Sequence, residues 1–264
     1  MDCSHSSKRL LRKRVDWSAI AVVKVVVRIA GWSGPRNIST AMMRAWESRP
    51  DCSVVDEPFY GCYLQESRAE HPMREAIIRS QPRTREGVEA QLRENQLSRL
   101  QYEKHMTHHM PQGSDLSWAV EAKHVFLIRS PARVIASYRQ KMPSVTSEDI
   151  GIVRQRELFD EISTMLGERP PVIDSVDVLA NPEGVLRKLC HVLGVEWIEG
   201  SMTKWTAGRR ASDGVWASHW YGAVETSTGF AKPAAEVPVV EPADRSLVSE
   251  MQEHYEAMAE FKLT

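Results

Sequence analysis

A strand, a glycine-containing turn and a helix follow one another directly near the N-terminus, and this succession most constrains the fold. The segment Val22 to Ala30 is rich in β-branched residues, which suits a central parallel strand. The turn GWSGPRNIST (31–40) comes next, and apolar side chains then recur at helical spacing. Such a turn places backbone N–H groups and a helix N-terminus where a phosphate can bind.

Short apolar segments alternate with amphipathic ones along the rest of the chain. The apolar segments predict strands at 52–57, 123–130 and 170–175. The amphipathic segments predict helices at 84–102, 131–141, 147–167 and 181–195. This alternation predicts an α/β fold with a single doubly wound parallel sheet of about four to five strands and helices on both faces. We expect one domain over residues 21–264, with a long loop at 199–240 and a closing helix at 242–263.

Residues 1–20 contain a cluster of basic residues ahead of the first apolar stretch. They resemble the start of a signal peptide, but Lys24 and Arg28 interrupt the apolar stretch, so we expect a disordered basic tail, with targeting as the alternative. The four cysteines form neither a C-x-x-C pair nor a dense disulfide pattern, which indicates reduced thiols and a cytoplasmic protein.

The overall charge is nearly balanced, with 34 Lys and Arg against 35 Asp and Glu. A net charge of −1 provides no general field for binding nucleic acid or an anionic membrane, and no membrane span is expected. Any anion site must therefore be local. The sequence is equally compatible with a monomer and a homo-oligomer.

The first candidate anion site is the turn itself. Its candidate binding residues are Gly34, Pro35, Arg36, Asn37, Ser39 and Thr40. A Walker A motif would need a Lys ahead of the hydroxyl residue, and Arg36 is the only cation in the turn. This absence disfavours a kinase or NTPase, which needs that Lys on the terminal phosphates. An ordinary turn that opens a helix is the alternative interpretation.

A second candidate anion site lies about 90 residues downstream. HVFLIRSPARVIASY (124–138) predicts a strand that ends at Arg129, a tight Pro turn, and a helix that carries Ser137. A guanidinium group can hold a phosphate through two hydrogen bonds, and a hydroxyl adds a further donor. Taken alone, Arg129 could equally be a solvated residue or an ion-pair partner.

Together the two motifs resemble the P-loop sulfotransferase superfamily. The turn resembles its 5′-phosphosulfate loop, and the second motif resembles its 3′-phosphate signature, although Ser130 and Ala132 depart from the usual Asp and Arg. The resemblance implies 3′-phosphoadenosine 5′-phosphosulfate (PAPS) as co-substrate, adenosine 3′,5′-bisphosphate as product, and no metal. It also implies that Arg129 and Ser137 hold the 3′-phosphate, and that Arg36 serves both binding and catalysis.

A sulfotransferase needs a base that takes the acceptor proton. Glu57 follows the second predicted strand at the position that the resemblance assigns to a base, and a carboxylate at the rim of an apolar cleft can have a raised pKa. Asp56 or Glu57 could instead pair with Arg36 and only order the turn. His105 and His108 are the alternative bases; they also suggest zinc, but no Cys or acidic partner stands at ligand spacing.

A late Gly- and Trp-containing segment, 206–220, resembles more loosely the loop that closes over the co-substrate in this superfamily. Arg209 or Arg210 would then reach the 3′-phosphate, and Trp216 would flank the adenine or the acceptor. An exposed Trp-rich loop could equally serve as a partner surface.

The sequence thus predicts transfer of a sulfuryl group from PAPS to a hydroxyl or amine of a small-molecule acceptor. A catalytically silent P-loop scaffold that binds a nucleotide or a partner is the alternative, and a small-molecule kinase is a further one.

Overall fold

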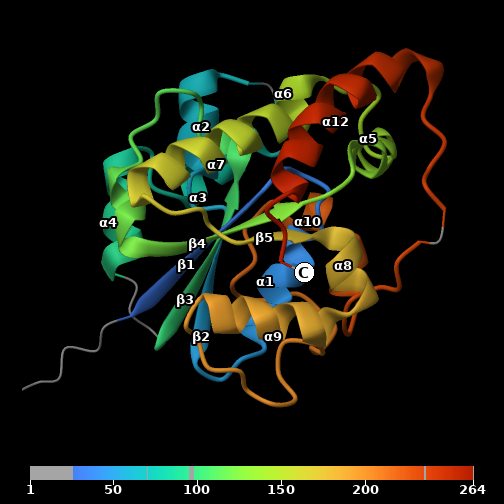
Figure 1. Cartoon of the computed structure of the whole chain (residues 1–264). Coiled ribbons are helices and arrows are strands. Elements are labelled where there is room, and N and C mark those ends of the chain that lie inside the picture. The colour runs from blue at the N-terminus through green and yellow to red at the C-terminus, as the bar shows by residue number, and fades with distance from the viewer. Residues whose placement is uncertain (1–25, 70, 95–97, 235, 264) are drawn as a thin grey trace, which may run out of the picture.

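Five parallel strands form one sheet at the centre of the molecule (Figure 1). The computed structural model describes residues 26–69, 71–94, 98–234 and 236–263. The strand order is β2-β3-β1-β4-β5, with β1 at Val27–Ser33, β2 at Cys52–Asp56, β3 at Leu100–Met106, β4 at Ala122–Ile128 and β5 at Val172–Asp174. The predicted α/β class and single parallel sheet of four to five strands are confirmed.

Helices cover both faces of the sheet (Figure 1). One face carries α1 (Ser39–Glu47), α8 (Ser175–Ala180) and α9 (Pro182–Val192). The opposite face carries α4 (Arg85–Glu94), α7 (Ile152–Leu166) and α12 (Arg245–Ala259). The remaining helices are α2 (Tyr60–Ser67), α3 (Arg74–Ser80), α5 (Pro131–Arg139), α6 (Ser147–Ile150), α10 (Ala217–Trp220) and α11 (Gly222–Glu225).

The apolar alternation of the central strand explains the two layers. Ile29 packs into the core beneath α1 and α9, whereas Ala30 and Trp32 pack into the core beneath α4 and α7. Successive side chains of a strand point to opposite faces, so β1 contributes to both cores at once. The loop that follows β1 is therefore anchored by a strand that is buried on both sides.

The prediction of one helix over residues 84–102 was wrong from Leu100 onward. The helix α4 ends at Glu94, and Leu100–Met106 form β3, which lies between β1 and β2. All seven residues of β3 are buried, although Gln101, Glu103 and Lys104 are polar. Their side chains have buried partners, which conceals the apolar pattern expected of a central strand.

Smaller differences concern helix ends. Gly151, with a φ of 62°, separates α6 from α7 within the segment predicted as one helix over 147–167. The predicted loop 199–240 contains the short helices α10 and α11, and the closing helix begins at Arg245 after a single 3₁₀ turn. The expected tail at residues 1–20 lies outside the described residues.

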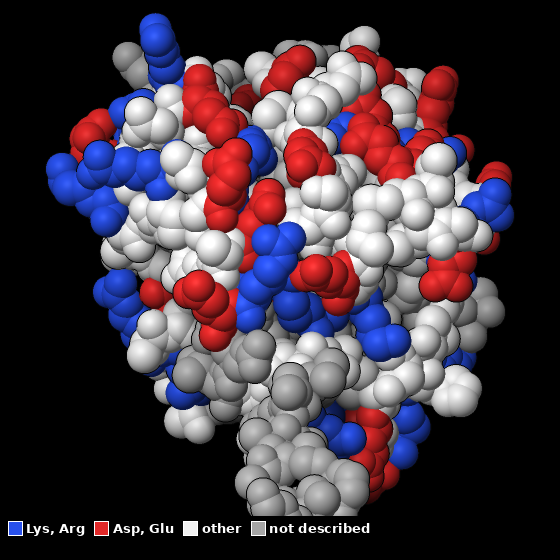
Figure 2. Space-filling model, turned by 90° about the vertical axis from the view of Figure 1, so that its left-hand side faces the viewer, with Lys and Arg blue, Asp and Glu red and all other residues white. Residues whose placement is uncertain are grey.

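The surface mixes charges of both signs. On the face that Figure 2 shows, Lys and Arg side chains are interspersed with Asp and Glu, in keeping with the near-zero net charge. Among the described residues, every helix is too short or too polar to cross a bilayer. Cys52, Cys62 and Cys190 are buried free thiols.

Candidate functional site

A cavity of about 440 Å³ opens where the carboxyl ends of the central strands meet their following loops. Open α/β sheets bind ligands at this edge. Three regions share its lining: the turn after β1, the start of α5, and the late segment 220–234. The predicted site residues that line it are Pro35, Arg36, Asn37, Ser39, Thr40, Glu57, His108, Arg129 and Ser137.

The turn after β1 has the shape of an anion cradle. Arg36 and Ile38 both adopt positive φ, at 60° and 53°, so the chain curls tightly before α1 begins. Ile38 caps α1 without a side-chain hydrogen bond, and Ser39 and Thr40 of the first helical turn line the cavity. Uncapped N–H groups at a helix N-terminus attract anions. Gly34 packs tightly here, because a Cβ would lie 2.4 Å from the Ile150 carbonyl oxygen.

Hydrogen bonds join the first motif to the second. The Arg129 guanidinium donates to the Arg36 carbonyl oxygen, and Arg36 Nε donates to Ser137 Oγ at 3.0 Å. Asn37 Nδ2 donates to the Leu127 carbonyl oxygen of β4 at 2.6 Å. The two predicted anion sites thus form one surface, although about 90 residues separate them in the sequence.

Positive charge accumulates at this end of the cavity. Burial lowers the pKa of Arg36, and burial together with repulsion from Arg133 and Arg36 lowers the pKa of Arg129. Among the described residues, no carboxylate forms an ion pair with any of these three guanidinium groups, and Lys232 adds a fourth cation to the lining. A bound anion would relieve this repulsion.

Acidic side chains lie elsewhere along the same cavity. Glu57 lines it, and its Oε1 accepts from Lys104 Nζ at 2.5 Å, while Asp56 Oδ1 accepts from the same ammonium at 3.0 Å. The carboxylates therefore pair with Lys104, whereas the alternative considered for them was Arg36. Burial, opposed by Lys104 and supported by Asp56, raises the pKa of Glu57. A carboxyl group in this state can accept a proton from a bound molecule.

The two candidate histidines occupy different places. His108 lines the cavity, and burial, with repulsion from His71 and Lys104, lowers its pKa to about 4. His105 lies on the opposite face of β3, where it stacks on Trp32 at 4.6 Å and contacts Glu103 at 3.1 Å. The structure thus places His108, but not His105, in the lining of the cavity that the turn after β1 also lines.

The late segment contributes other residues than expected. Arg209 is exposed and lies outside the lining, and Trp216 is buried, with its Nε1 donating to the Tyr221 hydroxyl at 3.1 Å. Trp220, Tyr221 and Lys232 line the cavity instead. Sequence reasoning did not select these three, although Trp220 ends the Trp-containing segment 206–220 that it singled out and Tyr221 follows directly.

Among the described residues, no cluster of three or more His, Cys, Asp or Glu side chains has the arrangement of a metal site. The histidine-rich segment after β3 is no exception, since His105 points away from His108 and His109. The chemical groups gathered at the cavity are thus cations, backbone donors, carboxylates and aromatic rings.

Comparison with known sequences identifies the family. The family described as "Sulfotransferase domain" matches residues 27–261. Two Arabidopsis thaliana proteins, branched-chain-amino-acid aminotransferase-like proteins 1 and 2, are 33% and 30% identical over 206 residues, which is 78% of this chain. The matched part is only 37% and 36% of those proteins, so the chain spans little more than a third of their length.

Solved structures share the fold at low sequence identity. The sulfotransferase domain of the curacin biosynthetic pathway has a TM-score of 0.56 and 16% identity, covering 91% of this chain and 99% of that one. A sulfotransferase from Alicyclobacillus acidocaldarius has a TM-score of 0.55 and 13% identity, covering 90% and 98%. The match over residues 27–261 shows that the chain belongs to the sulfotransferase family.

Proposed function

We propose that the protein transfers a sulfuryl group from PAPS to a hydroxyl or amine of a small-molecule acceptor. One observation carries this proposal: cations without carboxylate partners and a carboxyl group of raised pKa line the same cavity. The cationic end suits a doubly phosphorylated nucleotide, and the carboxyl group suits removal of the acceptor proton.

The residues at the cationic end fit PAPS in two parts. The curled turn and the uncapped N-terminus of α1 supply donors for the 5′-phosphosulfate. Arg129 supplies a guanidinium with two parallel donors for the 3′-phosphate, and Ser137 supplies a hydroxyl. Arg133 and Lys232 add positive charge nearby. Because Arg129 also holds the Arg36 carbonyl, binding at the 3′-phosphate would order the 5′ loop.

PAPS supplies a sulfuryl group on a phosphate leaving group. The acceptor oxygen or nitrogen forms the new bond to sulfur while the bond from sulfur to the bridging oxygen breaks, and the electron pair stays on the 5′-phosphate. Glu57 takes the acceptor proton, with His108 as the second candidate, and Arg36 stabilises the charge that develops on the bridging oxygen. The sulfuryl group carries less charge than a phosphoryl group, so protein cations serve without a metal.

Aromatic side chains surround the remaining part of the cavity. Its lining includes Tyr60, His71, Tyr138 and Trp220, together with Met106. His71 packs between two of them, since its ring contacts Tyr60 at 5.4 Å and Trp220 at 5.9 Å. A flat or partly apolar acceptor matches such a lining.

A screen of PAPS against pooled hydroxyl and amine acceptors tests the proposal, with the product detected as the mass gain of one sulfuryl group. We expect turnover by the wild-type chain and its loss in Glu57→Gln. Calorimetry with adenosine 3′,5′-bisphosphate provides the acceptor-independent arm. Absence of nucleotide binding would refute the proposal, and binding without turnover of any acceptor would favour the silent scaffold.

A further inference from the structure

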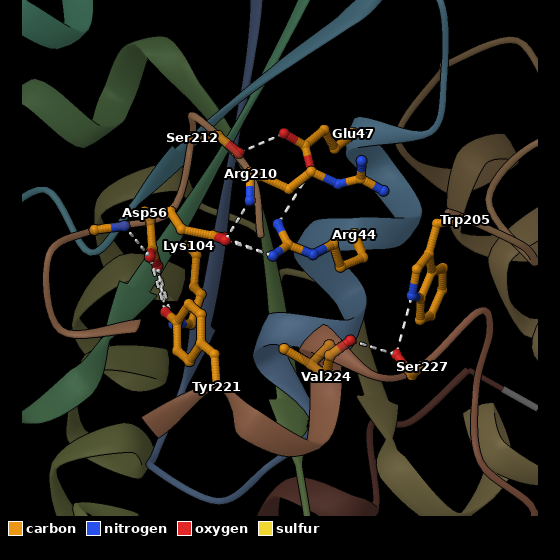
Figure 3. Close-up of polar contacts among 12 residues, drawn as sticks. Arg44, Glu47, Asp56, Lys104, Trp205, Arg210, Ser212, Tyr221, Val224 and Ser227 are labelled. Atoms are coloured by element: carbon orange, nitrogen blue, oxygen red, sulfur yellow. Dashed lines mark hydrogen bonds and ion pairs between the residues drawn. The ribbon is translucent and has the colours of Figure 1, made fainter. Parts of the chain in front are cut away.

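Asp56 accepts more hydrogen bonds than Glu57, its neighbouring carboxylate. Its oxygens accept from three donors: Lys104 Nζ at 3.0 Å, the Tyr221 hydroxyl at 2.8 Å and the Gly214 backbone N–H at 3.0 Å (Figure 3). The register of β2 on β3 places Asp56 directly opposite Lys104. Three donors on one buried carboxylate fix its orientation. Asp56 itself lies outside the cavity lining, so it cannot reach a bound acceptor.

The neighbouring carboxylate is held differently. Glu57 Oε1 contacts Lys104 Nζ at 2.5 Å and the Tyr221 hydroxyl at 3.4 Å, but among the described residues none donates a hydrogen bond to Oε2. His109 Nε2 is 3.9 Å from that oxygen. Glu57 has a φ of 42°, and its backbone is fixed by its N–H to the Lys104 carbonyl oxygen, at 2.9 Å. With this backbone conformation the Glu57 carboxylate lines the cavity, whereas the Asp56 carboxylate lies outside the lining.

We propose that Asp56 is a positioning residue for Glu57. Because Asp56 also binds the Lys104 ammonium, it weakens the attraction of that ammonium for Glu57. Glu57 is then oriented by Lys104 yet able to accept a proton. This inference rests on the proposed role of Glu57 as the base. It gives two adjacent carboxylates different roles, one that orients its neighbour and one that accepts the proton, a division that paired acids in active sites often show.

The charges around the cluster support this division. One ammonium faces two carboxylates, so each carboxylate weakens the hold of Lys104 on the other. Burial is the main cause that raises the pKa of Glu57; Lys104 opposes it, and the charge of Asp56 adds to it. The pKa of Lys104 is raised, because Asp56 and Glu57 together outweigh its burial. The ammonium therefore stays charged.

The other titratable groups that face Glu57 are neutral near pH 7. Burial and the charges of both carboxylates raise the pKa of Tyr221 well above its ordinary value, and burial and the charge of Glu57 raise the pKa of Tyr60. Burial, with repulsion from His108 and Lys104, lowers the pKa of His109 well below its ordinary range. Removal of Asp56 would thus leave Lys104 as the one charged partner of Glu57 in this cluster.

Two of the three donors to Asp56 come from the late segment. Gly214 and Tyr221 belong to a stretch that is also fixed to α1, where Asp213 pairs with the buried Arg44 at 2.6 Å and the Ser212 hydroxyl donates to Glu47 (Figure 3). Docking of this stretch and the state of Glu57 are therefore linked through Asp56.

The test is a carboxyl ¹³C NMR titration of Glu57 in the free full-length chain, with the resonance assigned by its loss in Glu57→Gln. We expect the Glu57 midpoint to move to lower pH in Asp56→Asn, because Lys104 then pairs with Glu57 alone. It should move to higher pH in Lys104→Gln, because the opposing cation is lost. Asp51→Asn, at the residue that precedes β2, is the matched control and should leave the midpoint unchanged.

Opposite shifts in the two variants are the signature of charge sharing, which a general loosening of the site would not produce. If Asp56→Asn does not fold, Asp56→Ser also removes the charge while keeping an acceptor for the Gly214 N–H, and it should shift the midpoint in the same direction. Shifts no larger than that of Asp51→Asn, or shifts of equal sign, would overturn the inference. The titration needs neither PAPS nor acceptor, so its outcome is independent of whether the turnover assay succeeds.

Turnover supplies the second readout. The acid limb of the pH profile of kcat should move to lower pH in Asp56→Asn, and the plateau should fall because a weaker base removes the acceptor proton less readily. The affinity for adenosine 3′,5′-bisphosphate should stay as in the wild type, since Asp56 lies outside the cavity lining. A loss of nucleotide affinity with an unchanged pH profile would contradict the positioning role.

Discussion

Replacement of Arg129 by Ala tests whether the cationic end of the cavity recognises a 3′-phosphate. The guanidinium lines the cavity and also donates to the Arg36 carbonyl oxygen. Its pKa is lowered by burial and by repulsion from Arg133 and Arg36, so the charge is poorly compensated in the free protein. A bound phosphate would gain from that charge more than from a solvent-exposed arginine.

Two contributions set the expected magnitude. Loss of a charge-assisted, two-pronged contact to the 3′-phosphate in a partly buried site costs about 2 to 4 kcal/mol, which is roughly a 30-fold to several-hundred-fold loss of affinity. Loss of the hydrogen bond to the Arg36 carbonyl loosens the 5′ loop and costs about 1 kcal/mol more, or roughly fivefold. Only the second contribution applies to a nucleotide without a 3′-phosphate.

Calorimetric titration of wild type and Arg129→Ala with adenosine 3′,5′-bisphosphate and with adenosine 5′-monophosphate separates the two contributions. We expect a large loss for the bisphosphate and a small one for the monophosphate. Arg187→Ala is the control and should change neither affinity. It removes an exposed arginine of α9 that pairs with Glu183 and Glu199. Equal losses for both nucleotides, or no loss for either, would refute the assignment of Arg129 to the 3′-phosphate.

Three further predictions follow from the same site and its surroundings. Glu57→Gln should lower turnover by roughly 10²-fold or more in single-turnover assays while calorimetry shows unchanged PAPS affinity; if His108→Ala is inactive and Glu57→Gln is not, the base is His108. Treatment with EDTA should leave the rate unchanged, and activity lost to EDTA but restored by Zn²⁺ or Mg²⁺ would contradict metal-free transfer. Burial acts to raise the pKa of Glu103, but hydrogen bonds from His105 and Arg28 outweigh it and lower the pKa to about 2. Because the folded-state pKa lies below the ordinary 4.5, this carboxylate contributes about 3 kcal/mol to stability above pH 4.5, which is lost as the pH falls toward 2. Urea unfolding at several pH values should show a smaller acid-dependent loss for Glu103→Gln than for wild type.

The strands with plain apolar patterns were predictable, and the one with buried polar residues was not. The strands predicted at 22–30 and 123–130 overlap Val27–Ser33 and Ala122–Ile128, because β-branched and aromatic residues are frequent in those segments; the first strand extends through residues 31–33, which were predicted as part of the turn. Glu103 of β3 pairs with Arg28 of β1 at 2.6 Å and accepts from Gln101 Nε2 at 2.8 Å, so the polar side chains of this buried strand have partners that offset part of their desolvation. Such pairing depends on tertiary contacts that a local pattern does not contain.

The local structure of the two motifs proposed to bind phosphate was predictable, because each is a continuous stretch between a strand and a helix. The residues that complete the cavity come from a segment without periodicity. Trp220, Tyr221 and Lys232 reach it because residues 206–229 fold back over α1, held by the Arg44–Asp213 ion pair and by an isolated bridge between Lys204 and Gly229. Neither contact has a sequence signal, since the partners lie far apart or within irregular chain.

The missed strand also explains why the choice of base stayed open in the sequence. If residues 100–106 continued a helix, Lys104, His105 and His108 could all face the acceptor, since positions three and four apart share a helix face. As a strand, the same residues alternate, so Lys104 points to Asp56 and Glu57 while His105 points to Trp32 and Glu103 on the other side of the sheet. The register of β2 on β3 sets Lys104 opposite Asp56, the residue before Glu57. Recognition of β3 would therefore have placed Lys104 and His105 on opposite faces of the sheet and set the ammonium beside the carboxylates, which is the arrangement on which the proposed chemistry depends.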